Sequence, residues 1–179
     1  MDAEGAAERP HLEPVRRGVG GADLVQFARL YEGHHIDVLR YALVLVRNRE
    51  EAEDVAAETF ARAWRAWAGG SRPPGQDVAW LLAIARNIAT DRWRRIRRRA
   101  SRPAGRSAQD TFADAEQRLW LDALARTLPP RQREVIALRY HRDLSDADIG
   151  KVMGLSESGV RSLVARAIST LRQHPEVWQ

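Results

Sequence analysis

The chain has 179 residues, a formal net charge of +5 and a sequence pI near 10.5, and this length fits one domain or two small ones. A hydrophobic fraction of 44% supplies enough apolar material for a folded core and excludes a wholly disordered protein. The absence of cysteine excludes disulfides and cysteine-containing zinc sites.

The first predicted helix follows an N-terminal tail. Residues 1–21 contain prolines and glycines without an apolar period, so we expect a disordered tail there. Asp23 is the expected N-cap of the helix, and a break is expected near Gly33. Its buried stripe consists of apolar residues at spacings of mostly three and four, namely Leu24, Phe27, Leu30, Tyr31, Val38, Leu39, Ala42, Leu43 and Val46.

Two further helices complete a predicted first domain over residues 22–99. One runs from about Glu50 to Trp67, and its acidic side chains crowd its first half, where they favour the helix dipole. Glycines and prolines mark residues 68–77 as a loop. The next helix begins near Asp77 and ends in a basic run made of Arg92, Arg94, Arg95, Arg97, Arg98 and Arg99.

A second domain is predicted over residues 111–179. Residues 100–110 are polar and without apolar period, which is typical of a flexible interdomain linker. The helices expected beyond it run over residues 111–127 and 131–140, from the N-cap Ser145 to Met153, and from the N-cap Ser156 to about Gln173. No β-hairpin signal is present, so the predicted fold is all-α with two small helical domains.

The last two predicted helices have helix-turn-helix spacing, since only the segment from Gly154 to Ser156 separates them. A recognition helix exposes donors near its N-terminus, where they reach base edges in the major groove of DNA. The residues placed to do this are Ser156, Glu157, Ser158, Arg161 and Ser162, with Arg166 one turn further on and suited to phosphate. An ordinary helical hairpin with a solvated polar face has the same spacing.

Arginine supplies almost all of the positive charge, because Lys151 is the only lysine. Its guanidinium makes two-point contacts with phosphates and base edges, although the codon usage of a GC-rich genome also raises the arginine content. Four tryptophans lie near arginines around the loop, namely Trp64, Trp67, Trp80 and Trp93. This arrangement suits single-stranded DNA, and the alternative is that the tryptophans belong to the core and the arginine run is a solvated helix end.

The acidic helix that ends near Trp67 is a candidate surface for a protein partner. Two or more of its carboxylates, together with exposed edges of Phe60 or Trp67, would suit protein docking. A normal amphipathic helix with a charged face is the alternative.

Residues 51–64 read EAEDVAAETFARAW, residues 80–95 read WLLAIARNIATDRWRR, and residues 128–135 read LPPRQREV. These three segments, in this order, resemble the extracytoplasmic-function family of bacterial sigma factors, the minimal type that has only sigma regions 2 and 4. The first is similar to the region 2.2 motif D-A-E-D-L-V-Q-E-T-F-x-R-A-W, and the second resembles the family's W-L-x-x-I-A-R-N-x-x-x-D-x-x-R-R. The third, together with residues 144–167, resembles the family's region 4.

The resemblance implies that the chain binds core RNA polymerase and promoter DNA. The clamp helices of the largest polymerase subunit would be bound by Asp54, Glu58 and Phe60. The −10 promoter element would be melted and read as a single strand by Ser71, Trp80, Arg86, Asn87, Asp91, Arg92 and Arg95. The −35 duplex would be read by Ser156, Glu157, Ser158, Arg161, Ser162 and Arg166. An anti-sigma factor is a further expected partner.

Several positions depart from the family pattern. Ala57 stands where the region 2.2 motif has glutamine, and Gly150 follows Ile149 where region 4 has alanine. Leu163 replaces a frequent basic residue in the last helix, and Gly159 lowers the helix propensity there by up to about 1 kcal/mol. Ala57 is expected to weaken one polymerase contact, whereas the departures in region 4 bear on which −35 sequence is read and leave the mode of docking unchanged.

Two other classes of protein stay open at this stage. One is a helix-turn-helix regulator that acts without replacing sigma, and the other is a sigma-like decoy that sequesters an anti-sigma factor. We expect no enzymatic activity, cofactor, metal or small-molecule substrate, because no paired carboxylates, nucleophile set or phosphate-binding glycine loop stands out. We also expect a cytoplasmic protein without membrane insertion, because no apolar leader or run of about 20 apolar residues is present.

Overall fold

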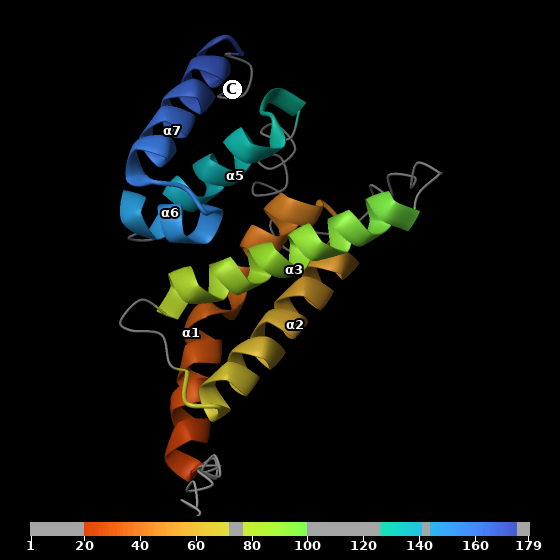
Figure 1. Ribbon diagram of the computed structural model, residues 1–179, viewed down its shortest axis with the longest axis vertical. Helices are drawn as coiled ribbons and strands as arrows, with labels where there is room; N and C mark the ends of the chain where they lie inside the picture. The colour runs from red at the N-terminus through yellow and green to blue at the C-terminus, as the bar shows by residue number, and fades with distance from the viewer. Residues whose placement is uncertain (1–19, 72–76, 100–125, 141–143, 175–179) are drawn as a thin grey trace, which may run out of the picture.

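The computed structural model describes residues 20–71, 77–99, 126–140 and 144–174. Six α-helices and no strand occupy these ranges, which confirms the predicted all-α class (Figure 1). The helices are α1 (Gly21–Val46), α2 (Arg49–Ala68), α3 (Asp77–Arg99), α5 (Pro130–Arg139), α6 (Asp146–Met153) and α7 (Glu157–Arg172). The predicted tail, apart from its last two residues, the linker and nearly all of the helix expected over residues 111–127 lie outside the described residues.

The first helix corrects two expectations. It is continuous through Gly33, because its apolar stripe packs against α2, α3 and α5 and outweighs the roughly 1 kcal/mol that an interior glycine costs. Its N-cap is Gly20, and Asp23 is the third helical residue, whose carboxylate accepts a hydrogen bond from the Gly20 amide at 3.2 Å. Asp23 therefore lies at the third position inside the helix, where a capping box places an acidic side chain, and it is not the N-cap that the sequence predicted.

Helices α1, α2 and α3 form the first lobe. Asn48 caps α2, since its side-chain oxygen accepts a hydrogen bond from the amide of Glu51 at 2.9 Å. An aromatic cluster joins α1 to α2, in which the Phe27 ring packs edge-on against three rings of α2 with centroid separations of 5.0 to 6.5 Å, namely Phe60, Trp64 and Trp67. The buried face of α3 completes the core through Leu81, Leu82, Ala85 and Ile88.

Helices α5, α6 and α7 form the second lobe, and the predicted caps are confirmed. The amides of Asp148 and Gly159 each donate to a serine hydroxyl at 3.2 Å, those of Ser145 and Ser156. Gly154 ends α6 with φ at +65°, a left-handed conformation that glycine adopts without steric cost. The turn between α6 and α7 is therefore fixed locally by Gly154 and the Ser156 cap, and the Ser145 cap fixes the beginning of α6.

Gly150 makes this turn tight. A Cβ atom at this position would lie 2.6 Å from the carbonyl oxygen of Leu155, closer than real Cβ contacts allow. The departure from the family's alanine thus lets the turn fold back on α6 more closely than a side chain permits.

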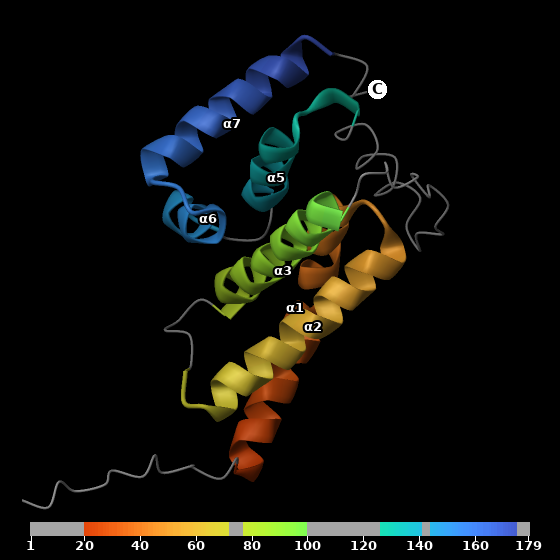
Figure 2. The same cartoon turned by 45° about the vertical axis from the view of Figure 1, so that its right-hand side comes forward.

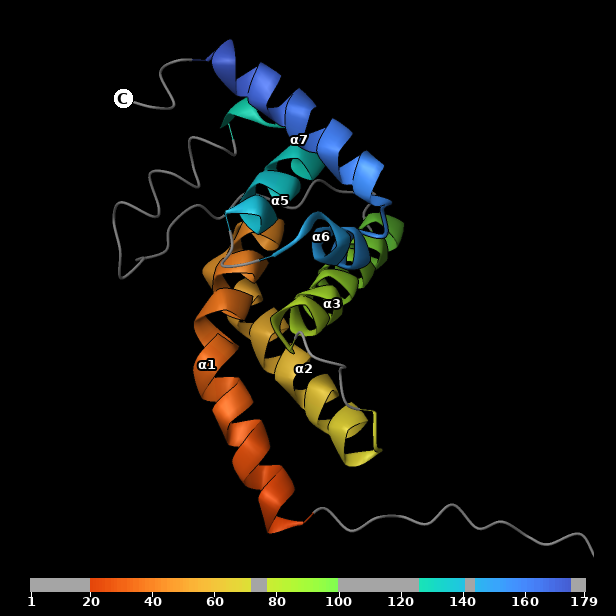
Figure 3. The same cartoon turned by 90° about the vertical axis from the view of Figure 1, so that its left-hand side faces the viewer.

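The two lobes are in contact. Helix α6 packs against α3 and α5 packs against α1, and α7 lies on the side of the second lobe that faces away from α1 and α2 (Figures 1, 2 and 3). One hydrophobic cluster includes buried residues of both lobes, from Leu30 in α1 to Leu171 in α7. The described part of the chain therefore forms a single packed body built from two helical units.

Candidate functional site

The outer face of α7 carries all of the residues predicted to read duplex DNA. Ser156, Glu157, Ser158, Arg161, Ser162 and Arg166 are all exposed. The Ser156 hydroxyl caps the helix and lies 3.1 Å from the Ser158 hydroxyl, and either oxygen of the pair can donate. The beginning of α7 therefore presents hydroxyl groups at the positive end of the helix dipole, which suits phosphate and base-edge acceptors.

Two arginines extend from the same face. A terminal nitrogen of Arg161 lies 3.6 Å from carboxylate oxygens of both Asp146 and Glu157, so it is held near the turn by two ion pairs. Arg166 donates from Nε to the carbonyl of Ser162 at 3.3 Å and is exposed one turn further along. The pair of Arg161 with Glu157 is solvent-accessible and weak, and both guanidinium groups are exposed.

The opposite face of α7 explains one departure from the family pattern. Leu163 is buried together with Val160, Val164, Ala167 and Leu171 in the core of the second lobe. A basic side chain at position 163 would bring its charge toward that core. The leucine therefore serves packing in this chain, and no cation is missing from the exposed face of α7.

The base of α6 is reinforced by Asp148, which is buried. Burial raises the pKa of this carboxyl, but hydrogen bonds from Ser145 and Lys151 outweigh burial and hold the pKa below its usual value. The Lys151 ammonium donates to Asp148 at 3.1 Å. Asp148, the third residue of α6, thus anchors the first helix of the helix-turn-helix.

The residues predicted for the −10 strand divide into three groups along α3 and the end of α2. Ser71, Asn87, Asp91 and Arg95 are exposed. Trp80 is half-buried against the hydrophobic core, and Arg92 pairs with Asp54 at 3.4 Å. The rest of the loop, residues 72–76, lies outside the described residues.

Arg86 departs from the expectation that it is open to DNA. Its Nε donates to Glu134 of α5 at 2.6 Å, and its side chain is only 21% exposed. The same carboxylate oxygen accepts a hydrogen bond from the Tyr41 hydroxyl of α1 at 2.8 Å. In this structure Arg86 belongs to the contact between the lobes, because the pairing with Glu134, 48 residues away, turns it toward α5.

The residues predicted to bind polymerase lie on α2 but differ in exposure. Asp54 is exposed, and Glu58 lies between Arg62 at 2.7 Å and Arg65 at 3.4 Å. The hydrogen bond from Arg62 is the main cause that lowers the pKa of Glu58. The expected exposed edge of Phe60 is wrong, because this side chain is only 7% exposed, and Trp67 is buried as well.

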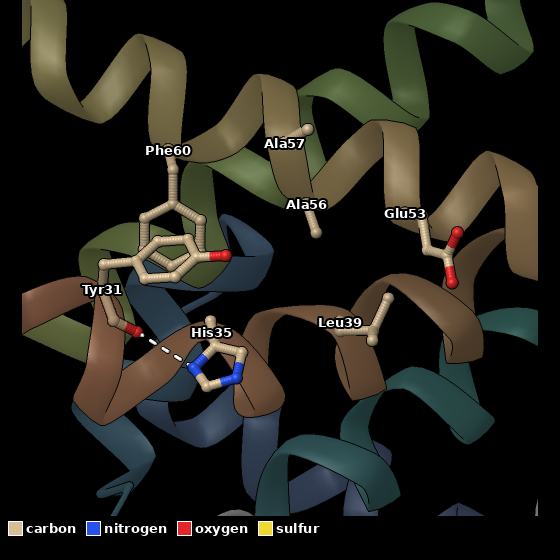
Figure 4. Close-up of a pocket in the computed structure, with 7 residues that line it drawn as sticks. All are labelled: Tyr31, His35, Leu39, Glu53, Ala56, Ala57 and Phe60. Atoms are coloured by element: carbon tan, nitrogen blue, oxygen red, sulfur yellow. Dashed lines mark hydrogen bonds between the residues drawn. The ribbon is translucent and has the colours of Figure 1, made fainter. Parts of the chain in front are cut away.

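A pocket of about 220 Å³ lies between α1 and α2, beside these residues (Figure 4). It is lined by Tyr31, His35, Leu39, Glu53, Ala56, Ala57 and Phe60. The His35 ring stacks on Tyr31, with centroids 5.2 Å apart and planes 11° from parallel. Sequence reasoning missed this pocket, although the small residues at positions 56 and 57 of the acidic helix were a signal that its surface is hollow there.

Within the described ranges, no group of three or more histidine or acidic residues is placed to hold a metal ion. The helices described are also all too short or too polar to cross a membrane.

Comparison with known proteins agrees with this arrangement. Residues 30–99 match the family model for sigma-70 region 2, and residues 124–173 match that for sigma-70 region 4. The chain is 34% identical over 170 residues to the ECF RNA polymerase sigma factor BldN of Streptomyces coelicolor, a match that covers 89% of this chain and 64% of BldN. It is 33% identical over 165 residues to the ECF RNA polymerase sigma factor SigL of Mycobacterium tuberculosis, which covers 87% of this chain and 92% of SigL.

A solved structure shares the fold. Sigma factor RpoE, in its complex with the anti-sigma factor NepR from Bartonella quintana, superposes with a TM-score of 0.68 at 24% sequence identity. The superposition covers 86% of this chain and 99% of RpoE. Because a relative of 33% identity is matched over nearly its full length, the chain belongs to the family of extracytoplasmic-function RNA polymerase sigma factors.

Proposed function

We propose that this chain is an alternative sigma factor that binds core RNA polymerase, directs it to promoters with −10 and −35 elements and promotes their melting. The observation that carries the proposal is the pairing of two family regions in one chain, with every predicted −35 residue on the exposed face of α7. A family of sigma factors is not a family of enzymes, and we propose that this chain has no catalytic activity, cofactor or small-molecule substrate of its own.

The proposed polymerase-docking surface is the outer face of α2 together with the pocket between α1 and α2. Asp54 and Glu58 would exchange their solvent-accessible ion pairs with arginines of this chain for basic groups of the partner. The pocket offers an apolar cavity that Glu53 helps to line. A helix of the polymerase clamp that presents basic and apolar side chains would complement both. Phe60 contributes through its place in the pocket wall.

Promoter melting is the step with the largest cost, about 1.4 kcal/mol for each base-pair step that is opened. A protein offsets this cost when it traps flipped bases and neutralises the displaced backbone. We assign these tasks to Ser71, Asn87, Asp91 and the basic end of α3, where Arg94 and Arg95 follow the 59%-exposed Trp93. The final helix α7 would dock in the major groove of the −35 duplex.

We extend two further features to this chain as proposals. Since Bartonella RpoE is bound by an anti-sigma factor in its solved complex, we propose an anti-sigma factor as a regulatory partner here. Since transcription takes place on the bacterial chromosome, we also propose that the chain works in the cytoplasm without membrane insertion.

The test is reconstitution of transcription with purified core polymerase and a library of promoter fragments. A sigma factor yields promoter-specific transcripts that start at defined positions, whereas core polymerase alone yields none. A helix-turn-helix regulator would bind duplex DNA tightly by itself and leave the start sites unchanged. A decoy would bind an anti-sigma factor and direct no transcription, and either result would contradict the proposal.

A further inference from the structure

The contact between the lobes contains a buried carboxylate. Glu134 on α5 is only 6% exposed, and it accepts hydrogen bonds from Tyr41 of α1 and Arg86 of α3 at 2.8 and 2.6 Å. Tyr41 is 3% exposed, and burial is the main cause that raises its pKa, so its hydroxyl stays a proton donor. The second lobe thus contributes the acceptor, and the first lobe contributes both donors.

These three residues form a cluster that exists only while the lobes are in contact. Tyr41 and Arg86 lie on helices of the first lobe, and Glu134 lies on a helix of the second. In sequence, Glu134 is 93 residues from Tyr41 and 48 residues from Arg86. A buried carboxylate that loses its hydrogen-bonding partners is strongly unfavourable. The cluster therefore fixes one docking geometry of α5 on α1 and α3, because a shifted geometry leaves a buried charge without partners.

Arg133, next to Glu134, is buried in the same interface. Burial is the main cause that lowers its pKa, followed by the positive charge of Arg47 at the end of α1, whereas the negative charge of Glu134 raises it. Glu134 therefore also offsets the charge of a buried arginine in this contact.

We propose that the Tyr41–Glu134–Arg86 cluster is an autoinhibitory latch, which holds the second lobe against the first in the free chain and keeps Arg86 away from DNA. When the lobes separate, Glu134 becomes solvated and the Arg86 guanidinium becomes available to a phosphate or base. The DNA part of this inference rests on the proposed function, whereas the closed state does not. The latch therefore makes two predictions that are tested separately.

The closed state is tested by distance measurement on the full-length chain in the absence of polymerase and DNA. The chain has no cysteine, so spin labels at Glu32→Cys on α1 and Ser169→Cys on α7, both exposed, are specific. We expect one narrow distance distribution for this labelled chain and a broad, longer one when Glu134→Ala is added. Removal of one partner of a buried ion pair should lower the ratio of closed to open chains by at least about tenfold.

Two variants keep the result interpretable. Glu50→Ala removes an exposed carboxylate of α2 and should leave the distribution narrow. Glu134→Gln is isosteric and should open the chain to a smaller extent, and it replaces Glu134→Ala if circular dichroism shows that the alanine variant has lost helix. A broad distribution in the chain with Glu134 intact, or a narrow one that Glu134 substitutions leave unchanged, would overturn the latch.

The masking of Arg86 is tested with a fluorescent single-stranded oligonucleotide of mixed sequence at low salt. The opened Glu134→Ala chain should bind it several-fold more tightly than Glu50→Ala, which carries the same change of net charge. If the distance measurement shows that Glu134→Ala is open and the two variants still bind the oligonucleotide equally tightly, the contact between the lobes does not mask Arg86. Neither readout involves polymerase, so failure of the sigma-factor proposal itself would show only in the transcription assay.

Discussion

The two lobes carry their predicted DNA-binding residues in different ways. On α7 of the second lobe all six residues lie on one exposed face, and the helix is positioned by caps and a turn within about a dozen residues of sequence. On α3 of the first lobe the predicted residues are divided between solvent, the hydrophobic core and contacts with other helices. Short-range signals therefore describe the second surface well and the first only in part.

The difference teaches where a motif is a reliable guide to exposure. A helix-turn-helix uses a helical period that separates its core face from its DNA face within one short segment. The W-L-x-x-I-A-R-N segment serves the core, the interface between the lobes and the predicted DNA surface together. Arg86 and Asn87 are neighbours in that motif, and yet one pairs with Glu134 while the other is exposed.

The largest expected effect concerns a residue that the family motif assigns to polymerase. Phe60→Ala should lower the free energy of unfolding by about 3–5 kcal/mol, because it removes a buried ring that packs against Phe27 and Tyr31. Trp93→Ala, at an exposed ring, should change it by about 0.5 kcal/mol or less. Urea denaturation followed by circular dichroism measures both. If Phe60→Ala kept full stability but lost polymerase binding, the Phe60 ring would belong to the binding surface and not to the core.

The second effect concerns recognition by α7. Arg161→Ala should cost roughly 1–3 kcal/mol on the preferred −35 sequence, whereas Arg166→Ala should weaken all sequences about equally and reduce the salt dependence of binding. Both side chains are exposed, so neither change should lower the stability of the chain. Binding of the reconstituted holoenzyme to a set of −35 variants tells the two apart. Unchanged sequence preference in Arg161→Ala would refute the role of this arginine in reading bases.

The third effect depends on pH and concerns the base of the helix-turn-helix. The folded-state pKa of Asp148 is lowered, so its contribution is present above the usual carboxyl pKa of about 4 and is lost as the pH falls through the folded value. Asp148→Asn should therefore cost about 1 kcal/mol at neutral pH and progressively less below pH about 4. Urea midpoints at pH 7 and pH 3 measure the difference. A cost that stays constant over this range would show that the carboxylate charge is not what stabilises the turn.

The smallest effect compares two helical glycines, one in each lobe. Gly33→Ala should stabilise the chain by up to about 1 kcal/mol, since nothing lies within 4 Å of the added methyl group. Gly150→Ala gains the same helix propensity but must displace the Leu155 carbonyl from 2.6 Å, so it should be neutral or destabilising. The melting temperature of Gly33→Ala should therefore be higher than that of Gly150→Ala. The reverse order would mean that the turn relaxes without cost.

Much of the architecture follows from local sequence. The presence of the described helices and the serine caps of α6 and α7 were predicted from signals that act over three or four residues. The continuity of α1 through Gly33 was not, because burial against three other helices decides it. Propensity ranks residues in isolation, and tertiary packing overrides it wherever a long apolar stripe spans the weak position.

The candidate site was predictable to a different degree. The exposed face of α7 and the acidic face of α2 could be read from residue type and period. The burial of Phe60 and the pairing of Arg86 could not, since they depend on Tyr31 and Glu134, which lie 29 and 48 positions away in sequence. The pocket beside Ala57 also needs two helices to form its walls.

The paired hydroxyl groups at the beginning of α7 have a consequence for its proposed contact with DNA. Ser156 accepts from the Gly159 amide, and the proton between Ser156 and Ser158 can belong to either oxygen. When Ser156 donates to Ser158, the free O–H is on Ser158, and when the direction reverses it is on Ser156. Under the proposed function, the beginning of this helix would thus satisfy a DNA acceptor at either of two neighbouring places without moving its backbone, and it would tolerate related −35 sequences.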